Sequence, residues 1–183
     1  MSQIQVIHNA GDIEGLCVII PKVHGDRRGY FTETYNKNDM DEAGLNFNFV
    51  QDNQSGSTKG VLRGLHFQIN FPQTKLVRVI KGSVFDVAVD FRRGSRTFGK
   101  YYGVELSDEN HKQLLIPKNF AHGFLVLSDT AEFCYKCDDF YHPNDEGGIF
   151  YADPDINIKW PEVDVPLILS DKDKILPKLK EIL

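Results

Sequence analysis

Short runs in which apolar and polar residues alternate, separated by turn residues, fill most of this chain. Such alternation is typical of β-strands that bury one face and wet the other. The clearest run is VFDVAVDF at 84–91, where four apolar side chains share one face and Asp86 and Asp90 share the other. We expect the apolar face of this strand to be buried and the aspartate face to be solvated.

The neighbouring segment 61–68 follows the alternation badly. Strict alternation places Arg63 and His66 on opposite faces, with Gly64 between them. A glycine inside a strand often marks a bulge, and a bulge would bring both side chains to the same face. Polar residues on an otherwise buried strand form either a lined pocket or a satisfied internal network. The pattern leaves both open.

The other elements follow from the same reading. Further strands are expected at 16–20, 29–35, 97–106, 113–116, 124–127 and 131–136, and a short apolar stretch lies at 47–51. The expected helices are a turn at 38–44, with Asn38 or Asp39 as its N-cap, and a C-terminal helix at 170–183 broken at Pro177. Segment 55–57 is expected to be flexible. Short strands without long crossover helices predict a mainly β fold, an antiparallel sandwich or barrel.

Composition narrows the class of protein. A length of 183 residues and a hydrophobic fraction of 41% suit one well-buried core, and without an internal repeat or linker we expect a single domain over 1–183. The formal charge of −5 offers no long-range attraction for nucleic acid or an anionic membrane. The N-terminal segment has no basic region and no long apolar run, so we expect a cytoplasmic protein without a signal peptide or membrane span.

The cysteines do not predict a disulfide framework or a zinc site. Cys134 and Cys137 have C-x-x-C spacing, but they lie three residues apart in an expected strand and therefore point to opposite faces. No second pair completes a zinc site, so we interpret them, with Cys17, as bystander thiols.

Two histidines suggest a cupin but not its metal. The spacing Pro117-x-Asn119-x-x-His122 matches the second cupin motif. The first motif requires His-x-His followed closely by Glu, whereas His66 is followed by Phe-Gln with no acidic residue before Asp86. Because a catalytic metal usually takes three protein ligands, the cupin fold is favoured and a metal is not.

Four stretches together carry a resemblance to a known family. They are GVLRGLHFQ at 60–68, the run from Pro72 to Ser95, IPKNFAHGFLVLSDTAEFCYK at 116–136, and LSDKD at 169–173. They resemble the dTDP-4-dehydrorhamnose 3,5-epimerases from about residue 15 to residue 173. The resemblance implies a homodimeric cupin-type jelly roll with short peripheral helices, without metal or cofactor. It also implies epimerisation at C3 and C5 of a dTDP-4-keto-6-deoxysugar in dTDP-L-rhamnose biosynthesis.

The implied reaction assigns four catalytic residues. Removing a proton beside a 4-keto group and returning one on the opposite face requires a base, an acid and a cation near the enolate oxygen. By resemblance, His66 is the base, Tyr135 the acid and Lys75 the cation. Asp173 matches the carboxylate that orients the base.

Each assignment has a structural alternative. Tyr135 could be an ordinary half-buried strand tyrosine, and Lys75 a solvated loop lysine. Asp173 stands three residues after Ser170, which is the spacing of a helix cap. Occurrence of all three inside long motifs favours the catalytic interpretation. If Tyr135 is not the acid, Tyr141 is the next candidate.

The resemblance also implies a set of ligand contacts. Arg28 and Glu33 match residues that read the nucleobase, and Arg63 suits the diphosphate because guanidinium groups pair with phosphate oxygens. The remaining expected contacts are Gln51, Asp52, Asn53, Lys75, His122, Glu146 and Lys172.

Two rival functions remain open. A single-position epimerase of the same fold would keep the base and the acid and would differ in pocket shape. A non-catalytic sugar-nucleotide-binding cupin would be expected to lack His66 or Tyr135, and this chain has both.

Overall fold

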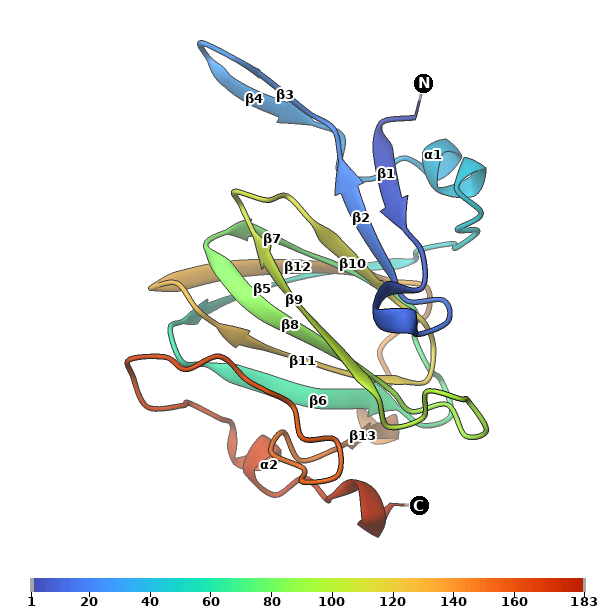
Figure 1. Cartoon of the computed structure of the whole chain (residues 1–183), viewed down its shortest axis with the longest axis vertical. Coiled ribbons are helices and arrows are strands. Elements are labelled where there is room, and N and C mark those ends of the chain that lie inside the picture. Colours follow the sequence, from blue (N-terminus) through green and yellow to red (C-terminus); the bar gives the residue numbers. More distant parts are fainter. Residues whose placement is uncertain (1, 183) are drawn as a thin grey trace.

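The long strands pair antiparallel in two sheets that face each other (Figure 1). The structure is a computed structural model and describes residues 2–182. One sheet has the order β1-β2-β10-β7-β12-β5, formed by Ile4–Ile7, Cys17–Pro21, Gln113–Ile116, Lys75–Lys81, Thr130–Cys137 and Gln51–Thr58. The second has the order β13-β6-β11-β8-β9, formed by Glu146–Gly148, Leu62–Gln68, Phe120–Val126, Ser83–Asp90 and Tyr101–Ser107.

A separate hairpin projects from these sheets (Figure 1). It consists of β3, Val23–Asp26, and β4, Gly29–Thr32. The short helices lie at the periphery: η1 (Ala10–Asp12), α1 (Lys37–Glu42), η2 (Pro143–Asp145), α2 (Asp171–Lys174) and η3 (Leu179–Glu181). The expected mainly β, cupin-type jelly roll with short peripheral helices is confirmed. Among residues 2–182, no helix is long and apolar enough to cross a membrane.

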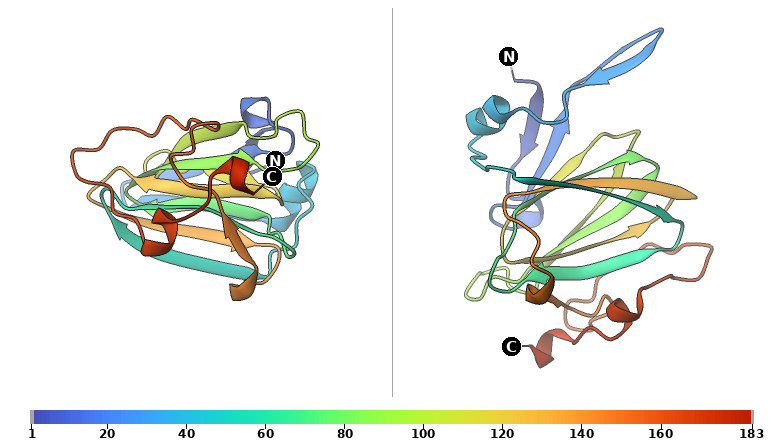
Figure 2. Two further views of the ribbon diagram at one scale, coloured as in Figure 1. Left: turned by 90° about the horizontal axis from the view of Figure 1, so that it is seen from below. Right: turned by 180° about the vertical axis from the view of Figure 1, so that it is seen from behind.

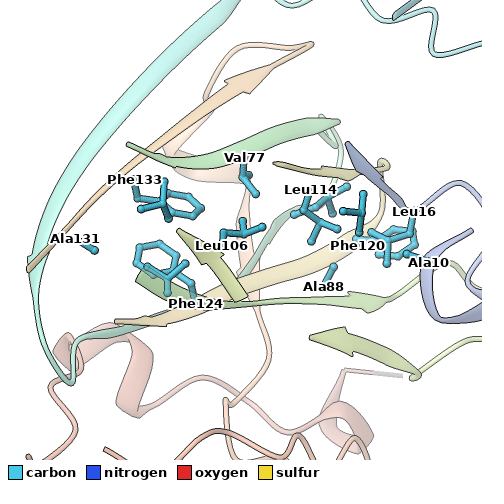
Figure 3. Packing of buried hydrophobic residues seen from close by; sticks show 14 of the residues in the cluster. Ala10, Leu16, Val77, Ala88, Leu106, Leu114, Phe120, Phe124, Ala131 and Phe133 are labelled. Atoms are coloured by element: carbon cyan, nitrogen blue, oxygen red, sulfur yellow. The ribbon is translucent and has the colours of Figure 1, made fainter. Parts of the chain in front are cut away.

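The core fills the space between the two sheets (Figure 3). Phe124 from β11 and Phe133 from β12 stack at one end of it with ring centroids 4.2 Å apart. Val77, Leu106 and Leu114 are fully buried beside them. The polar residues described below line a cavity that continues from this core, so the sheets that bury the core also place the site.

The expectation of a solvated aspartate face on β8 is wrong. Val84 and Ala88 point into the core between the sheets, whereas Val87 and Val89 pack against Ile149 on the other side. The C-terminal segment covers the outer face of the five-stranded sheet, as Figure 2 shows from below and behind. It therefore buries Val87 and Val89, which an open sheet would leave exposed. Asp86 and Asp90 alternate with Val84 and Ala88, so they face the space between the two sheets, and both are buried there.

Several element boundaries also differ from those expected. The N-cap of α1 is Asn36, whose side chain accepts a hydrogen bond from the Asn38 backbone, and not Asn38 or Asp39. Segment 55–57 belongs to β5 and pairs with β12. Residues 97–100 form a turn ahead of β9, β11 starts at Phe120, and β4 ends at Thr32. The expected C-terminal helix is reduced to two short pieces, α2 and the 3₁₀ turn η3, and Pro177 lies between them as the predicted break.

Candidate active site

A bulge in β6 brings Arg63 and His66 to one side, as the sequence predicts. His66 pairs with His122 and Arg63 pairs with Phe124, so three steps along β6 match two along β11. Gly64 permits this irregularity because its φ is 116° and an added Cβ would lie 2.6 Å from the Cα of Gly123. Both side chains therefore line the same cavity.

This cavity has a volume of about 630 Å³ and lies between the two sheets. That volume is in the usual range for a small-molecule site. Its polar lining residues are Asn53, Gln54, Ser55, Arg63, His66, Lys75, His122, Tyr135, Ser170, Lys172 and Asp173. The ambiguity between a lined pocket and an internal network is thereby resolved in favour of a pocket.

His66 is held by Asp173, which α2 carries over the end of β6. The Nε2 atom of His66 lies 2.6 Å from Oδ1 of Asp173, and the carboxylate is almost fully buried. With Nε2–H donating to Asp173, the lone pair of Nδ1 is left to accept a proton. Ser170 caps α2, since its Oγ accepts a hydrogen bond from the Asp173 backbone N–H at 3.1 Å. The Asp173 carboxylate, which a capping box would turn back to the Ser170 backbone, bonds His66 instead.

The surroundings of His66 favour a neutral imidazole at neutral pH. Burial lowers its pKa below the ordinary value, and the hydrogen bond to Asp173 opposes that effect. The nearby positive charges of Lys75 and Lys172 lower the pKa further. An imidazole with a lowered pKa is unprotonated near pH 7, the state that a general base requires.

Tyr135 faces the same cavity from the opposite sheet. It lies on β12 of the six-stranded sheet, while His66 lies on β6 of the five-stranded sheet. Burial raises the pKa of the phenol, so it stays protonated at neutral pH and can donate its proton. A base and an acid thus approach the cavity from its two walls. Tyr141, the alternative acid, is half exposed and is not among the described residues that line this cavity.

Lys75 brings a positive charge to the cavity without a direct ion-pair partner among the described residues. It begins β7 and lines the cavity, so the interpretation as a solvated loop lysine is wrong. Among residues 2–182, its ammonium has no hydrogen bond or ion pair with any side chain. Burial lowers its pKa, although the negative charges of Asp86 and Glu146 are near enough to raise it in opposition. A cation of this kind, without a carboxylate partner, is available to an anionic oxygen of a ligand.

Asp86 is a buried partner that sequence reasoning missed. His122 Nε2 lies 3.1 and 3.0 Å from its two carboxylate oxygens, and both residues are buried. Because His122 is the cross-strand partner of His66, two His–Asp pairs lie on neighbouring strands. The available signal was an aspartate inside a strongly apolar strand, which we assigned to solvent. A buried charge needs a partner, and the histidine in the adjacent strand provides it.

The predicted nucleobase contacts do not reach this cavity. Arg28 lies on the projecting hairpin, bonds to Asp26, and has a side chain that is 83% exposed. Glu33 follows that hairpin and accepts a hydrogen bond from Asn36. Gln51 and Asp52 lie on β5, yet of the segment 51–53 only Asn53 lines the cavity. Within one chain the structure therefore separates Arg28, Glu33, Gln51 and Asp52 from His66.

Two other predicted contacts bind each other. Lys172 and Glu146 form an ion pair, with Lys172 on the wall of the cavity. Arg63 donates to Ser57 at the cavity mouth and keeps an exposed side chain.

Cys17, Cys134 and Cys137 are free thiols, and burial raises the pKa of Cys137 to about 11. Among residues 2–182, no three His, Cys, Asp or Glu side chains converge as a metal site would require.

Comparison with known proteins covers nearly the whole chain. The family model for dTDP-4-dehydrorhamnose 3,5-epimerase matches residues 10–181. A dTDP-4-dehydrorhamnose 3,5-epimerase from Methanothermobacter thermautotrophicus is 54% identical over 170 residues, which are 92% of this chain and 92% of that protein. A similar solved structure is a dTDP-6-deoxy-D-glucose-3,5-epimerase from Legionella pneumophila in complex with dTDP-4-keto-L-rhamnose. It is 50% identical with a TM-score of 0.93, and the match covers 98% of this chain and 95% of that chain.

A protein described as a 3′-monoepimerase is also similar to this chain. ChmJ, a 3′-monoepimerase from Streptomyces bikiniensis solved with dTDP-quinovose, is 34% identical with a TM-score of 0.88. The match covers 95% of this chain and 88% of that one. The family match, the sequence identities and the shared fold lead to one conclusion: the chain belongs to the dTDP-4-dehydrorhamnose 3,5-epimerase family.

Proposed function

We propose that this protein is an isomerase that inverts C3 and C5 of dTDP-4-dehydro-6-deoxy-D-glucose to give dTDP-4-dehydro-L-rhamnose, in dTDP-L-rhamnose biosynthesis. One observation carries the proposal. His66, held by Asp173, and Tyr135 line one cavity from opposing sheets, with the unpaired Lys75 beside them. Epimerisation next to a ketone needs this combination: a base, an acid on the other face, and a cation for the enolate oxygen.

The reaction uses the residues in sequence. Nδ1 of His66 removes the proton from a carbon flanking the 4-keto group, and the electron pair moves onto the ketone oxygen. The Lys75 ammonium stabilises the resulting enolate, which otherwise would be a strong base in a partly desolvated site. Tyr135 then donates its proton to the opposite face of the same carbon and the ketone reforms. The phenolate regains a proton from solvent, and the imidazolium of His66 releases its proton to solvent, so both groups return to their starting states. The same steps at the second flanking carbon complete the double inversion.

The ligand contacts follow the charges around the cavity. Arg63, exposed at the mouth, suits the diphosphate, and Asn53, Lys75, His122 and Lys172 line the path inward. No cofactor or metal enters this mechanism. We infer that the chain acts as one domain, 1–183, in the cytoplasm.

We infer further that the protein is a homodimer. The projecting hairpin exposes Tyr30 by 61% and Phe31 by 70%, and it carries Arg28 away from the cavity of its own chain. Large exposed aromatic residues on a protruding element mark an interaction surface. A second copy of the chain would cover them and would place Arg28 and Glu33 at the partner's cavity. Gln51 and Asp52, on the edge strand β5, would be covered in the same assembly.

Counting deuterium tests the function. The protein is incubated with dTDP-4-dehydro-6-deoxy-D-glucose in D₂O, and the product sugar is weighed by mass spectrometry. Two incorporated deuterons support the double epimerase. One deuteron supports the single-position alternative. That alternative corresponds to the activity of the similar 3′-monoepimerase. No incorporated deuterium would support the non-catalytic sugar-nucleotide-binding alternative.

A further inference from the structure

The helix that carries Asp173 is too short to be stable without tertiary contacts. α2 spans four residues, Asp171–Lys174, whereas isolated helices need roughly 12–15 residues to be even marginally stable in water. Its cap, from Ser170, fixes the local turn but not the place of the turn on the protein. The position of the Asp173 carboxylate therefore depends on what ties α2 to the sheet.

Contacts hold the chain on both sides of α2. Before α2, the Ile168 backbone N–H donates to Gly60 O at 2.8 Å, and Ile168 O accepts from the Leu62 backbone N–H at 3.0 Å. After α2, the Phe150 backbone N–H donates to Pro177 O at 2.8 Å. Leu176 packs so closely on β13 that an added Cβ on Gly148 would lie 2.7 Å from its Cδ2. A second cavity of about 730 Å³, open to solvent, has Glu146 and Gly148 of β13 and Lys172 and Leu176 of the C-terminal segment in its wall. Side chains therefore do not fill the space between Lys172 and β13.

The Glu146–Lys172 ion pair crosses this region. Glu146 lies on β13 and lines the second cavity, while Lys172 lines both cavities. β13 pairs with β6 so that Gly148 lies opposite His66. Lys172 in turn directly precedes Asp173. The ion pair thus connects β13, which lies beside the strand of His66, to α2, which carries Asp173.

We propose that Glu146 and Lys172 are positioning residues, which hold α2 against β13 so that Asp173 stays hydrogen-bonded to His66. The proposal rests on the function proposed above and gives these two residues a role other than direct ligand contact. Each side chain keeps partial exposure, so the pair acts as a tie across a gap and not as part of the core.

The test compares variants that break the pair with one that rebuilds it. Glu146→Gln and Lys172→Met each remove one partner, and the double variant Glu146→Lys with Lys172→Glu restores a pair of reversed polarity. Lys174→Met is the matched control, because Lys174 lies on the same helix and pairs only with the exposed Asp171. Lys172→Arg preserves the charge and should keep the hydrogen bond between His66 and Asp173.

Two readouts follow each variant. The first is the downfield proton resonance of His66 Nε2–H in the ligand-free protein, assigned by its loss in His66→Asn. It should be broadened or lost in both single variants, kept in Lys174→Met and Lys172→Arg, and recovered in the double variant. The second is kcat/KM, which should fall roughly two- to fivefold in the single variants and recover in the double variant.

Other outcomes would overturn the proposal. An unchanged resonance in both single variants would show that the pair does not position Asp173, and a raised KM with that unchanged resonance would assign the pair to ligand binding. Failure of the double variant to recover the resonance would also contradict it. A thermal melt verifies that each variant is folded. Because the resonance is measured without substrate, this result stands apart from the deuterium count that tests the function.

Discussion

At the scale of single residues, the pKa of His66 decides how activity depends on pH. Burial is the largest influence and lowers this pKa, while Asp173 raises it. Since the base must be neutral, kcat/KM should rise with pH through this pKa and then level off. In Asp173→Asn the raising influence is lost, so the acidic limb should move to lower pH. The plateau should fall by about 10²- to 10⁴-fold because the imidazole loses its orientation. A pH profile measures both, and an acidic limb that moves upward would contradict the assignment.

The absence of metal from the proposed chemistry is a second prediction at this scale. The enolate charge is assigned to Lys75, so dialysis against EDTA should leave kcat unchanged, and elemental analysis should find no stoichiometric transition metal. Lys75→Met, by contrast, should lower kcat by about 10²- to 10³-fold, as for loss of one oxyanion-stabilising group. Activity that disappears with chelator and returns with added metal would show that a metal ion, and not Lys75, stabilises the enolate.

The sequence could predict those site residues whose roles depend on motif and strand position. His66, Lys75, Tyr135 and Asp173 meet at one cavity as the resemblance implied. Asp86 could not be recognised, because both faces of its strand are covered: the C-terminal segment covers the apolar face, and the aspartate face turns inward between the two sheets. Arg28 was placed in the site by resemblance alone, and no local pattern shows that its hairpin points away from the body.

At the scale of elements, the bulge in β6 determines whether Arg63 and His66 share a cavity. Gly64→Ala would force a Cβ to within 2.6 Å of Gly123 Cα and 2.7 Å of His122 O, at a φ that disfavours a side chain. We expect a loss of at least about 2 kcal/mol in the free energy of unfolding, measured by denaturant titration. Gly56→Ala, in a strand where an added Cβ meets nothing within 4 Å, is the control and should change little. Equal stability of both variants would argue against a constrained bulge.

The bulge was predictable because one glycine interrupted an otherwise regular pattern. Segment 55–57 was not, since glycine is depleted in strands and serine is not among the residues enriched there. Pairing with β12 along the whole of β5 determines its conformation instead. Tertiary pairing of this kind cannot be seen in a local window of sequence.

At the scale of the whole molecule, the hairpin predicts a dimer with shared sites. Sedimentation at micromolar concentration should give twice the chain mass of 20.8 kDa. If Arg28 acts at the partner's cavity, Arg28→Ala and His66→Asn should each be weakly active or inactive alone. Co-expressed, they should form mixed dimers with one intact site and recover up to about a quarter of wild-type activity. A monomer, or no recovery in verified mixed dimers, would contradict the shared site.

The assignment of His66 as the base and Tyr135 as the acid is tested most directly by measuring, in D₂O, the exchange of substrate protons with solvent and the inversion of the substrate carbons. The wild-type protein should catalyse both exchange and inversion. His66→Asn should do neither, because no enolate forms. Tyr135→Phe keeps the ring and removes only the acidic proton, so it should still exchange substrate protons with retained stereochemistry while inversion falls by about 10²- to 10⁴-fold. Inversion by Tyr135→Phe at a rate near wild type, or exchange by His66→Asn, would contradict the account, and the former would make Tyr141 the next candidate acid.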